Sequence, residues 1–230
     1  METAIKTPIS WVGESGIRLD ASFYAGTGQK QARAFIHSNI EKTLLHRVTV
    51  DGSNGIYIPS RFKRMYVENE EHGYPYITGS GIVQEDPLQG CRYISRKYTR
   101  GVQRLLLKPG TIVVTCSGNI GNVAFIPDFL EGAVGSPDLI RIIPDPQKMR
   151  SGYLYSFLTS EVGRALITQH TYGSVVQHVE AHHLYDLPVP VLDPRVELEI
   201  HNSVVAGVKK RSTAYDAIHQ ARHRVNELLK

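Results

Sequence analysis

Short apolar runs recur through the first 192 residues, each bounded by turns rich in glycine, proline and asparagine. Their β-branched composition predicts strands at residues 55–59, 75–78, 110–115, 122–127 and 139–143. The turn-rich link between the third and fourth of these runs predicts a hairpin. Residues 187–192 alternate apolar residues with prolines, which predicts an extended segment because residues before proline avoid the α region.

Two segments of the same region follow helical spacing instead. Residues 29–39 predict one helix, and residues 151–169 predict another with Ser151 as its N-cap. In the second helix the apolar side chains share one face: Leu154, Phe157, Leu158, Val162, Ala165 and Leu166. Strands and helices mixed in this order predict an α+β fold, in which helices flank a twisted mixed or antiparallel sheet.

The pattern changes at Asp193, a predicted N-cap that precedes Pro194 in the first helical turn. From there, apolar and aromatic positions recur at spacings of four and three, as in the seam of a coiled coil. We therefore predict a globular domain at residues 1–192 and one long helix at residues 193–230. Such a helix would be about 50 Å long, which is too long for one small domain to cover.

An uncovered apolar stripe on this helix needs a partner helix, from a second copy of the chain or from another protein. The residues predicted to pair are Val204, Val208, Tyr215, Ile218, Val225 and Leu229. Arg211 and Arg222 lie on the same stripe, where they would fix the register or pair with acids of the partner. The alternative is a terminal helix that folds back on its own globular domain.

The composition is that of a folded protein, with 41% hydrophobic and 21% charged residues among 230. No apolar run approaches the ~20 residues needed to cross a bilayer, and the start of the chain lacks the apolar region of a secretory signal. Only two cysteines occur. These features lead us to expect a cytoplasmic protein with reduced thiols.

Charge is segregated along the chain, whose formal net charge is +4. Residues 67–86 hold five acids and no lysine or arginine, whereas residues 87–110 hold six bases and no acid. Such a block is typical either of a binding surface or of a solvated face that its acidic neighbour neutralises. A second basic cluster lies at residues 61–64.

Basic clusters on exposed loops favour a polyanionic partner and indicate a protein that binds nucleic acid. The candidate phosphate contacts are Arg61, Lys63, Arg64, Arg92, Arg96, Lys97 and Arg100. The candidate base readers are Asn119, Gln177 and His178.

Motifs for catalysis or cofactor binding are weak. The glycine-rich loop at residues 25–30 departs from the phosphate-binding loop, and no dinucleotide-binding glycine motif occurs. Four histidines cluster from His170 to His183 around Glu180, but their spacing differs from the helical His-Glu-x-x-His pair. We expect no catalytic site, no metal and no cofactor. The alternatives are a small metal-dependent nuclease or hydrolase that uses this cluster, and a scaffold that binds only protein.

Four stretches, at residues 18–24, 74–82, 105–123 and 171–190, follow one another in a characteristic order. The third is the most specific, with Pro109-Gly110 before an apolar strand and Ser117-Gly-Asn-Ile-Gly121 after it. In this order they resemble one target-recognition half of the specificity (S) subunit of type I restriction-modification systems. The Glu-Gln pair that the family usually has after the exit strand is missing from residues 193–199.

This resemblance implies a domain that reads one half of a bipartite DNA target without altering the DNA. It also implies a spacer helix that pairs antiparallel with another helix and docks adenine methyltransferase subunits, with or without a restriction subunit. A full S subunit has two such domains and two helices, so one of each implies a half-subunit that works as a homodimer or beside a second half. Helix length would then set the separation of the half-sites.

Overall fold

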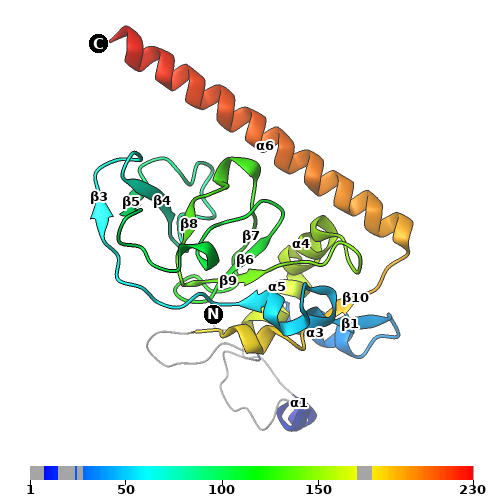
Figure 1. Ribbon diagram of the computed structural model, residues 1–230. Coiled ribbons are helices and arrows are strands. Elements are labelled where there is room, and N and C mark those ends of the chain that lie inside the picture. Colours follow the sequence, from blue (N-terminus) through cyan, green and yellow to red (C-terminus); the bar gives the residue numbers. More distant parts are fainter. Residues whose placement is uncertain (1–7, 15–23, 25–27, 170–177, 230) are drawn as a thin grey trace, which may run out of the picture.

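The computed structural model describes residues 8–14, 24, 28–169 and 178–229. Its α+β architecture confirms the predicted fold class, because helices flank mainly antiparallel sheets and one long helix forms the C-terminal part (Figure 1). The strands are divided between two four-stranded sheets and one two-stranded sheet. The small sheet pairs β1 (Lys42–Leu44) with β10 (Pro188–Pro190), so the predicted extended segment forms a strand.

The inner sheet has the strand order β2 (Ile56–Tyr57), β9 (Leu139–Ile142), β6 (Ile112–Thr115) and β7 (Val123–Phe125). All its pairs are antiparallel, and β6 and β7 form the predicted hairpin. Every residue of β6, β7 and β9 is buried, which explains why these strands read as continuous apolar runs. Both faces of this sheet are therefore covered.

Alternate residues of the inner strands face two different cores. Ile112 and Val114 pack into the main core together with the helices, whereas Val113 packs into a second core beneath the outer sheet. The same alternation separates Val123 from Ala124 on β7. The inner sheet is thus the central layer of the domain.

Three helices pack beside the main core: α3 (Gln29–Ile36), α4 (Ser151–Thr159) and α5 (Glu161–Thr168). The prediction of a single helix over residues 151–169 is wrong. Ser160 has extended backbone, and its Oγ accepts a hydrogen bond from the Gly163 N–H at 3.1 Å, which starts a new helix. The turn is so tight that a Cβ at position 163 would overlap the carbonyl oxygen of Phe157.

The predicted N-cap of the helix that starts at residue 151 is also wrong. Ser151 is the first residue of α4, and the cap position belongs to Arg150, whose side chain makes no capping hydrogen bond. Apart from the C-terminal helix, the remaining described helices are short: α1 (Ile9–Glu14), η1 (Leu45–Val48), η2 (Gly52–Gly55), η3 (Val102–Arg104), η4 (Asp128–Leu130) and η5 (Ala181–Leu184).

The outer sheet has the order β3 (Tyr66–Val67), β5 (Arg92–Ser95), β4 (Gly73–Ile77) and β8 (Val134–Gly135), with β4 and β8 parallel. Ile77 on its inner face packs into the second core. On its outer face Tyr76, Ile94 and Val134 form a third, smaller core. The sequence predicts only β4 of this sheet.

Arg141 on β9 ties the inner sheet to the loop that follows β8. The residue is 2% exposed, and its guanidinium donates hydrogen bonds of 2.6–3.2 Å to four carbonyl oxygens, those of Leu105, Gly135, Ser136 and Leu139. Burial lowers the pKa of Arg141 to about 10, so the side chain stays protonated at neutral pH. The four carbonyl dipoles compensate for part of the water that this buried charge has lost, while the buried Nε has no hydrogen-bond partner among the described residues.

α6 (Pro194–Leu228) confirms the long predicted helix. Asp193 caps it, because its carboxylate accepts a hydrogen bond from the Arg195 N–H at 2.8 Å. The helix runs along one side of the domain, and its C-terminal end projects beyond it (Figure 1). Within the described residues, no helix is long and apolar enough to span a membrane.

The domain covers more of α6 than the sequence leads us to expect. Val204 and Val208 pack at the edge of the main core, and Tyr215 stacks on Phe129 with ring centroids 4.3 Å apart. These three of the six predicted pairing residues therefore contact their own domain, so part of the predicted stripe is covered within the chain while the C-terminal end of the helix is not. No residue of α6 is fully buried, however.

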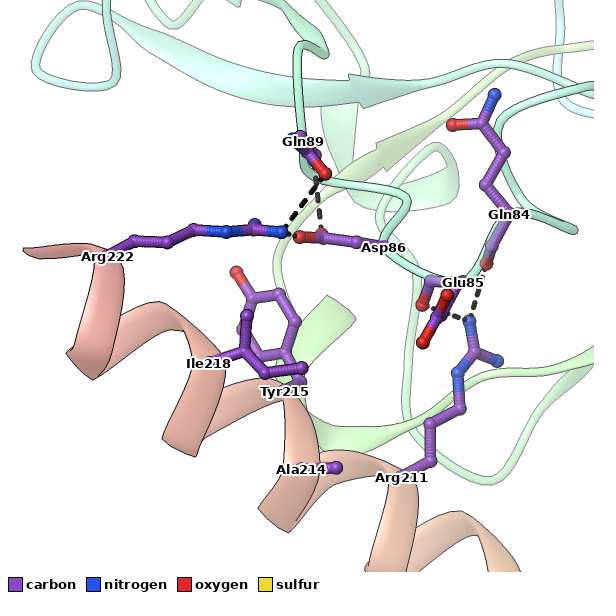
Figure 2. Close-up of a pocket in the computed structure, with 9 residues that line it drawn as sticks. All are labelled: Gln84, Glu85, Asp86, Gln89, Arg211, Ala214, Tyr215, Ile218 and Arg222. Carbon is purple, nitrogen blue, oxygen red and sulfur yellow. Dashed lines mark hydrogen bonds and ion pairs between the residues drawn. The ribbon is translucent and has the colours of Figure 1, made fainter.

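The two arginines of the predicted stripe also bind this chain's own domain. Arg211 donates to two carbonyl oxygens of the loop at residues 84–89, at 2.8 and 3.1 Å. Arg222 pairs with Asp86 of the same loop at 2.8 Å (Figure 2). Between the helix and this loop lies a pocket of about 430 Å³ that Ile218 helps to line.

Candidate nucleic-acid interface

The outer face of the outer sheet carries arginines that lie over tyrosine rings. The guanidinium carbon of Arg92 is 4.0 Å from the ring centroid of Tyr66, and that of Arg96 is 4.3 Å from the centroid of Tyr74. Tyr66 and Tyr74 both pair with Ile94 of the central strand β5, so the two rings and the arginines over them lie on the same face of the sheet. Arg92 is the first residue of strand β5, although the sequence pattern indicates a loop there.

Two further arginines repeat this arrangement. Arg64 lies 5.5 Å from the ring centroid of Tyr76, and Arg104 lies 4.5 Å from that of Tyr57. Stacking on a ring orients the guanidinium plane and leaves its in-plane N–H donors available to a ligand. The outer face therefore presents oriented cations rather than freely moving ones.

All seven predicted phosphate contacts are exposed, and they form two groups along β5. Arg61, Arg64 and Arg92 lie near its start, whereas Arg96, Lys97 and Arg100 lie past its end. The exposed Lys63 follows Phe62 in the same loop as Arg61 and Arg64. Because a strand rises about 3.3 Å per residue, β5 holds the two groups about 10 Å apart.

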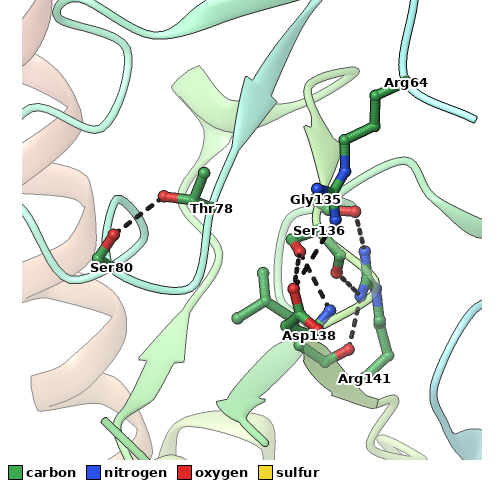
Figure 3. A network of polar contacts seen from close by, with 8 residues as sticks. Arg64, Thr78, Ser80, Gly135, Ser136, Asp138 and Arg141 are labelled. Carbon is green, nitrogen blue, oxygen red and sulfur yellow. Dashed lines mark hydrogen bonds and ion pairs between the residues drawn. The ribbon is translucent and has the colours of Figure 1, made fainter. Parts of the chain in front are cut away.

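An open pocket of about 540 Å³ lies beside the first group. Arg61, Phe62, Arg64 and Tyr66 line one side of this pocket, and Pro137 and Asp138 line the other. Nη2 of Arg64 is 3.9 Å from Oδ2 of Asp138, and the same Oδ2 accepts a hydrogen bond from the hydroxyl of Ser136 at 2.9 Å (Figure 3). The pocket therefore combines two cations with one carboxylate.

The predicted base readers lie next to this pocket. Asn119 is exposed in the turn between β6 and β7, and Ser117 in the same turn forms a β-bridge with His178. The carbonyl oxygen of Asp138 accepts a hydrogen bond from the N–H of Cys116 at 3.0 Å, which joins the turn to the pocket. The bridge thus places His178 beside the turn that holds Asn119, whereas Gln177 lies outside the described residues.

The sequence analysis missed two parts of this site. It identified the cations, but not the tyrosines beneath them or the carboxylate beside Arg64. Tyr74 and Tyr76 did carry a signal, because two aromatic residues with a spacing of two share one face of a strand, but the strand predicted at residues 75–78 left Tyr74 out. Asp138 carried none, since only the tertiary fold brings it to Arg64.

The titratable groups of the described residues do not assemble into a metal cluster. No group of three or more His, Cys, Asp or Glu side chains positioned to hold a metal ion occurs among them, and His170 lies outside the described ranges. Glu180 and His183 cap η5 reciprocally, with Nδ1 of His183 accepting from the Glu180 N–H at 3.1 Å. Burial raises the pKa of Cys116 to about 11, so this thiol is protonated at neutral pH.

A stacked basic face, a pocket of mixed charge and a polar turn define a class of protein that binds an anionic polymer with flat, hydrogen-bonding groups, as nucleic acids are. The chain belongs to the family of type I restriction modification DNA specificity domains, whose sequence pattern it matches over residues 59–193. Among curated proteins none matches the chain.

Several solved structures resemble the chain in fold. The S subunit of the type I restriction-modification system from M. genitalium has a TM-score of 0.49 and 17% identity, over 84% of this chain and 46% of its own. The HsdS subunit from Thermoanaerobacter tengcongensis has a TM-score of 0.47 and 16% identity, over 82% and 46%. A chain from a structure on complex assembly of the type I R-M system has a TM-score of 0.49 and 17% identity, over 81% of this chain and 45% of its own. The chain thus spans less than half the length of these proteins.

Proposed function

We propose that this chain is the non-catalytic DNA-recognition half-subunit of a type I-like restriction-modification system. The single observation that carries the proposal is the outer face of arginines stacked on tyrosines, next to the turn that holds Asn119. Family membership supplies the DNA-specificity function, and the geometry supplies a surface suited to it. To read a DNA sequence, a protein needs cations that contact phosphates and hydrogen-bonding groups that contact base edges, but it needs no nucleophile or metal.

The basic groups contact the phosphate backbone in this proposal. Arg92 and Arg96 lie on one face at opposite ends of β5, so they can contact separate phosphates of one duplex. Arg61, Lys63, Lys97 and Arg100 extend this line at both ends. Asn119, Gln177 and His178 then read base edges from the adjoining turn.

The helix supplies the second part of the proposal. We assign residues 1–192 to DNA recognition and residues 193–230 to a spacer that pairs with the equivalent helix of a second copy or of another half-subunit. The lack of any buried residue in α6 supports a further partner. Ile218, Val225 and Leu229 are 47%, 53% and 81% exposed, and we propose them as the main pairing residues, with Val204, Val208 and Tyr215 at the margin.

Pairing of two such chains would place two recognition faces at a fixed separation and so create a bipartite site. In this proposal adenine methyltransferase subunits dock on the paired helices, and a restriction subunit joins where the system has one. Coexpression with the methyltransferase subunit of the same host, followed by mapping of methylated adenines, is expected to reveal one bipartite motif.

Salt-dependent binding of the full chain to labelled duplex DNA tests the phosphate contacts. The double variant Arg92→Gln/Arg96→Gln removes two stacked cations. We expect weaker binding to every sequence and a slope of log affinity against log salt that is flatter by about 2.

The matched control is Lys209→Gln/Lys210→Gln, which removes the same charge from two exposed positions of α6. It is expected to leave affinity and slope close to those of the unaltered chain. Equal losses in both variants would contradict the proposed face. Stoichiometric metal with DNA cleavage by the chain alone would favour the hydrolase, and a chain that binds a protein but no duplex would favour the scaffold.

A further inference from the structure

We infer that Arg64 and Asp138 together read one G·C base pair in the major groove, Arg64 the guanine and Asp138 the cytosine. This inference rests on the proposed DNA-recognition function and changes the role of Arg64, which the sequence alone assigns to a phosphate. The two side chains both line the 540 Å³ pocket, and they point toward each other (Figure 3).

The position of Arg64 suits a base better than a phosphate. Its side chain is 43% exposed, and its guanidinium lies over the ring of Tyr76, a residue that is only 4% exposed and therefore a firm support. The 3.9 Å distance to Oδ2 of Asp138 is longer than a hydrogen bond, so the pair orients the guanidinium without using its donors. An arginine whose donors remain available can donate two parallel hydrogen bonds to O6 and N7 of guanine.

Asp138 has an acceptor left for a second ligand. Its Oδ2 accepts from the Ser136 hydroxyl at 2.9 Å, and that hydroxyl in turn accepts from the Asp138 N–H at 3.1 Å. Within the described part of the chain, no hydrogen bond to Oδ1 is formed, and the side chain is 38% exposed. A carboxylate oxygen is the natural acceptor for the N4 amino group of cytosine.

The buried Arg141 holds this pair in place. Its guanidinium donates to the carbonyl oxygens of Gly135 and Ser136, which precede Pro137 and Asp138 in the same loop (Figure 3). Asp138 is also tied to the reader turn through the Cys116 N–H. A reading pair whose backbone is fixed from behind loses little entropy when it binds, which is what discrimination between bases requires.

Charge distinguishes this pair from the other cations of the face. Of the seven predicted phosphate contacts, Arg64 alone has a carboxylate within 4.0 Å among the described residues. A carboxylate repels a phosphate but accepts from an amino group, so it selects a base edge. Guanine and its paired cytosine present acceptors and an adjacent donor in the major groove, which complement an arginine and an aspartate side by side.

Selection from a duplex library with a randomised core tests the inference, with the full chain and its variants as bait. The unaltered chain is expected to enrich a motif that contains at least one G·C pair. Arg64→Lys keeps the charge but loses the paired donors, so it should reduce the preference at one G·C position by about 5- to 150-fold while other positions keep theirs. Arg164→Lys, at an exposed position of α5 outside the proposed face, is the matched control and should leave every preference unchanged.

Modified bases assign the two contacts separately. At the affected position, 7-deazaguanine should weaken binding of the unaltered chain but not that of Arg64→Lys, because N7 is the missing acceptor. N4-methylcytosine opposite it should weaken binding of the unaltered chain more than that of Asp138→Asn, which removes the charge but keeps an oxygen for the Ser136 hydroxyl. Equal melting temperatures of chain and variants exclude a folding defect.

The outcomes separate this inference from the proposed function. If Arg64→Lys lowers affinity for all sequences by one factor and leaves the motif intact, Arg64 is a phosphate contact and the inference is wrong while the proposed function stands. If the motif contains no G·C pair, the inference is also wrong. If the unaltered chain enriches no sequence, the proposed function fails and base reading fails with it.

Discussion

The two ends of α6 have the same kind of sequence but different surroundings. Toward its N-terminal end, Val204 and Val208 pack at the edge of the main core, and the helix is tied to α4 through His201, which accepts from the Gly152 N–H at 3.1 Å. Toward its C-terminal end, Val225 and Leu229 are 53% and 81% exposed and contact no core. Both pairs belong to one stripe with spacings of four and three.

This difference shows that apolar spacing identifies the side of a helix that needs covering, but not what covers it. A stripe that packs on its own domain and a stripe that packs on a second helix place their apolar residues at the same intervals. In α6 the first part is covered within the chain, and the end that extends beyond Arg222 is exposed, which is where we propose that a partner helix packs.

The largest expected effect comes from a charge in the covered part. Val208→Asp places a carboxylate among half-buried apolar groups, so we expect the free energy of unfolding to fall by roughly 2 kcal/mol. Urea denaturation followed by circular dichroism measures this loss.

Val225→Asp makes the same change in the exposed part and serves as the control. We expect an unchanged stability of the isolated chain but a lower tendency to self-associate in sedimentation, because only a partner helix covers this position in the proposal. A loss of stability in Val225→Asp as large as that in Val208→Asp would show that the two ends of the helix do not differ.

A smaller effect is expected at the junction of α6 with α4. Glu197 accepts a hydrogen bond from the Arg150 N–H at 2.8 Å and pairs with its guanidinium at 3.4 Å, while its side chain is 13% exposed. Glu197→Ala leaves that N–H without its acceptor, which should cost about 1–2 kcal/mol of unfolding free energy.

Glu199→Ala is the matched control for this junction. Glu199 lies two residues further along α6 and is exposed. Its replacement by alanine should therefore change the unfolding free energy by less than about 0.5 kcal/mol. Equal effects of the two substitutions would show that net charge, and not the contact to Arg150, matters at the start of α6.

The sequence predicts those elements whose signal is local. The strands of the inner sheet are buried on both faces and so read as apolar runs, and α6 is visible from its cap and its spacing. The outer sheet was mostly missed because β3 and β8 have two residues each and β5 mixes arginine with apolar residues. The break at Ser160 was missed because apolar spacing continues across it.

The candidate site was predictable only in its charges. Arg64, Arg92 and Arg96 were found because basic residues cluster in the sequence. Their support by tyrosines depends on which strands are neighbours, and the contact of Arg64 with Asp138 depends on the turn that precedes β9. Neither relation follows from composition or spacing.

The next smaller effect on stability is expected for the ion pair at the end of the covered part of α6. Arg222 pairs with Asp86 at 2.8 Å, with side chains 47% and 19% exposed. Exposed pairs of this kind contribute about 0.2–1 kcal/mol, so a double-mutant cycle of Arg222→Ala and Asp86→Ala should give a coupling energy in that range that decreases with added salt. A coupling of zero would place the end of the covered part earlier, near Tyr215.

The smallest effect is a pH dependence at the same junction. Burial, and then the charge of Arg150, lower the pKa of His201, against the opposite influence of Glu197. Nδ1 of His201 accepts from the Gly152 N–H, so the folded chain favours the neutral ring. The unfolded chain binds a proton near the ordinary pKa of about 6.5, and it therefore holds more protons than the folded chain just below that pH.

The contribution of His201 to stability is thus complete above about pH 6.5 and is lost as the pH falls through the folded-state pKa. His183 in η5 also has its pKa lowered by burial and has the same sign, so replacement of His201 removes only part of the decline. We expect His201→Gln, whose amide oxygen can still accept from Gly152, to lose less stability than the unaltered chain between about pH 7.5 and 5.5 in thermal denaturation. If both lose the same amount, the covered start of α6 does not titrate, and its attachment to α4 depends on apolar packing and Glu197 alone.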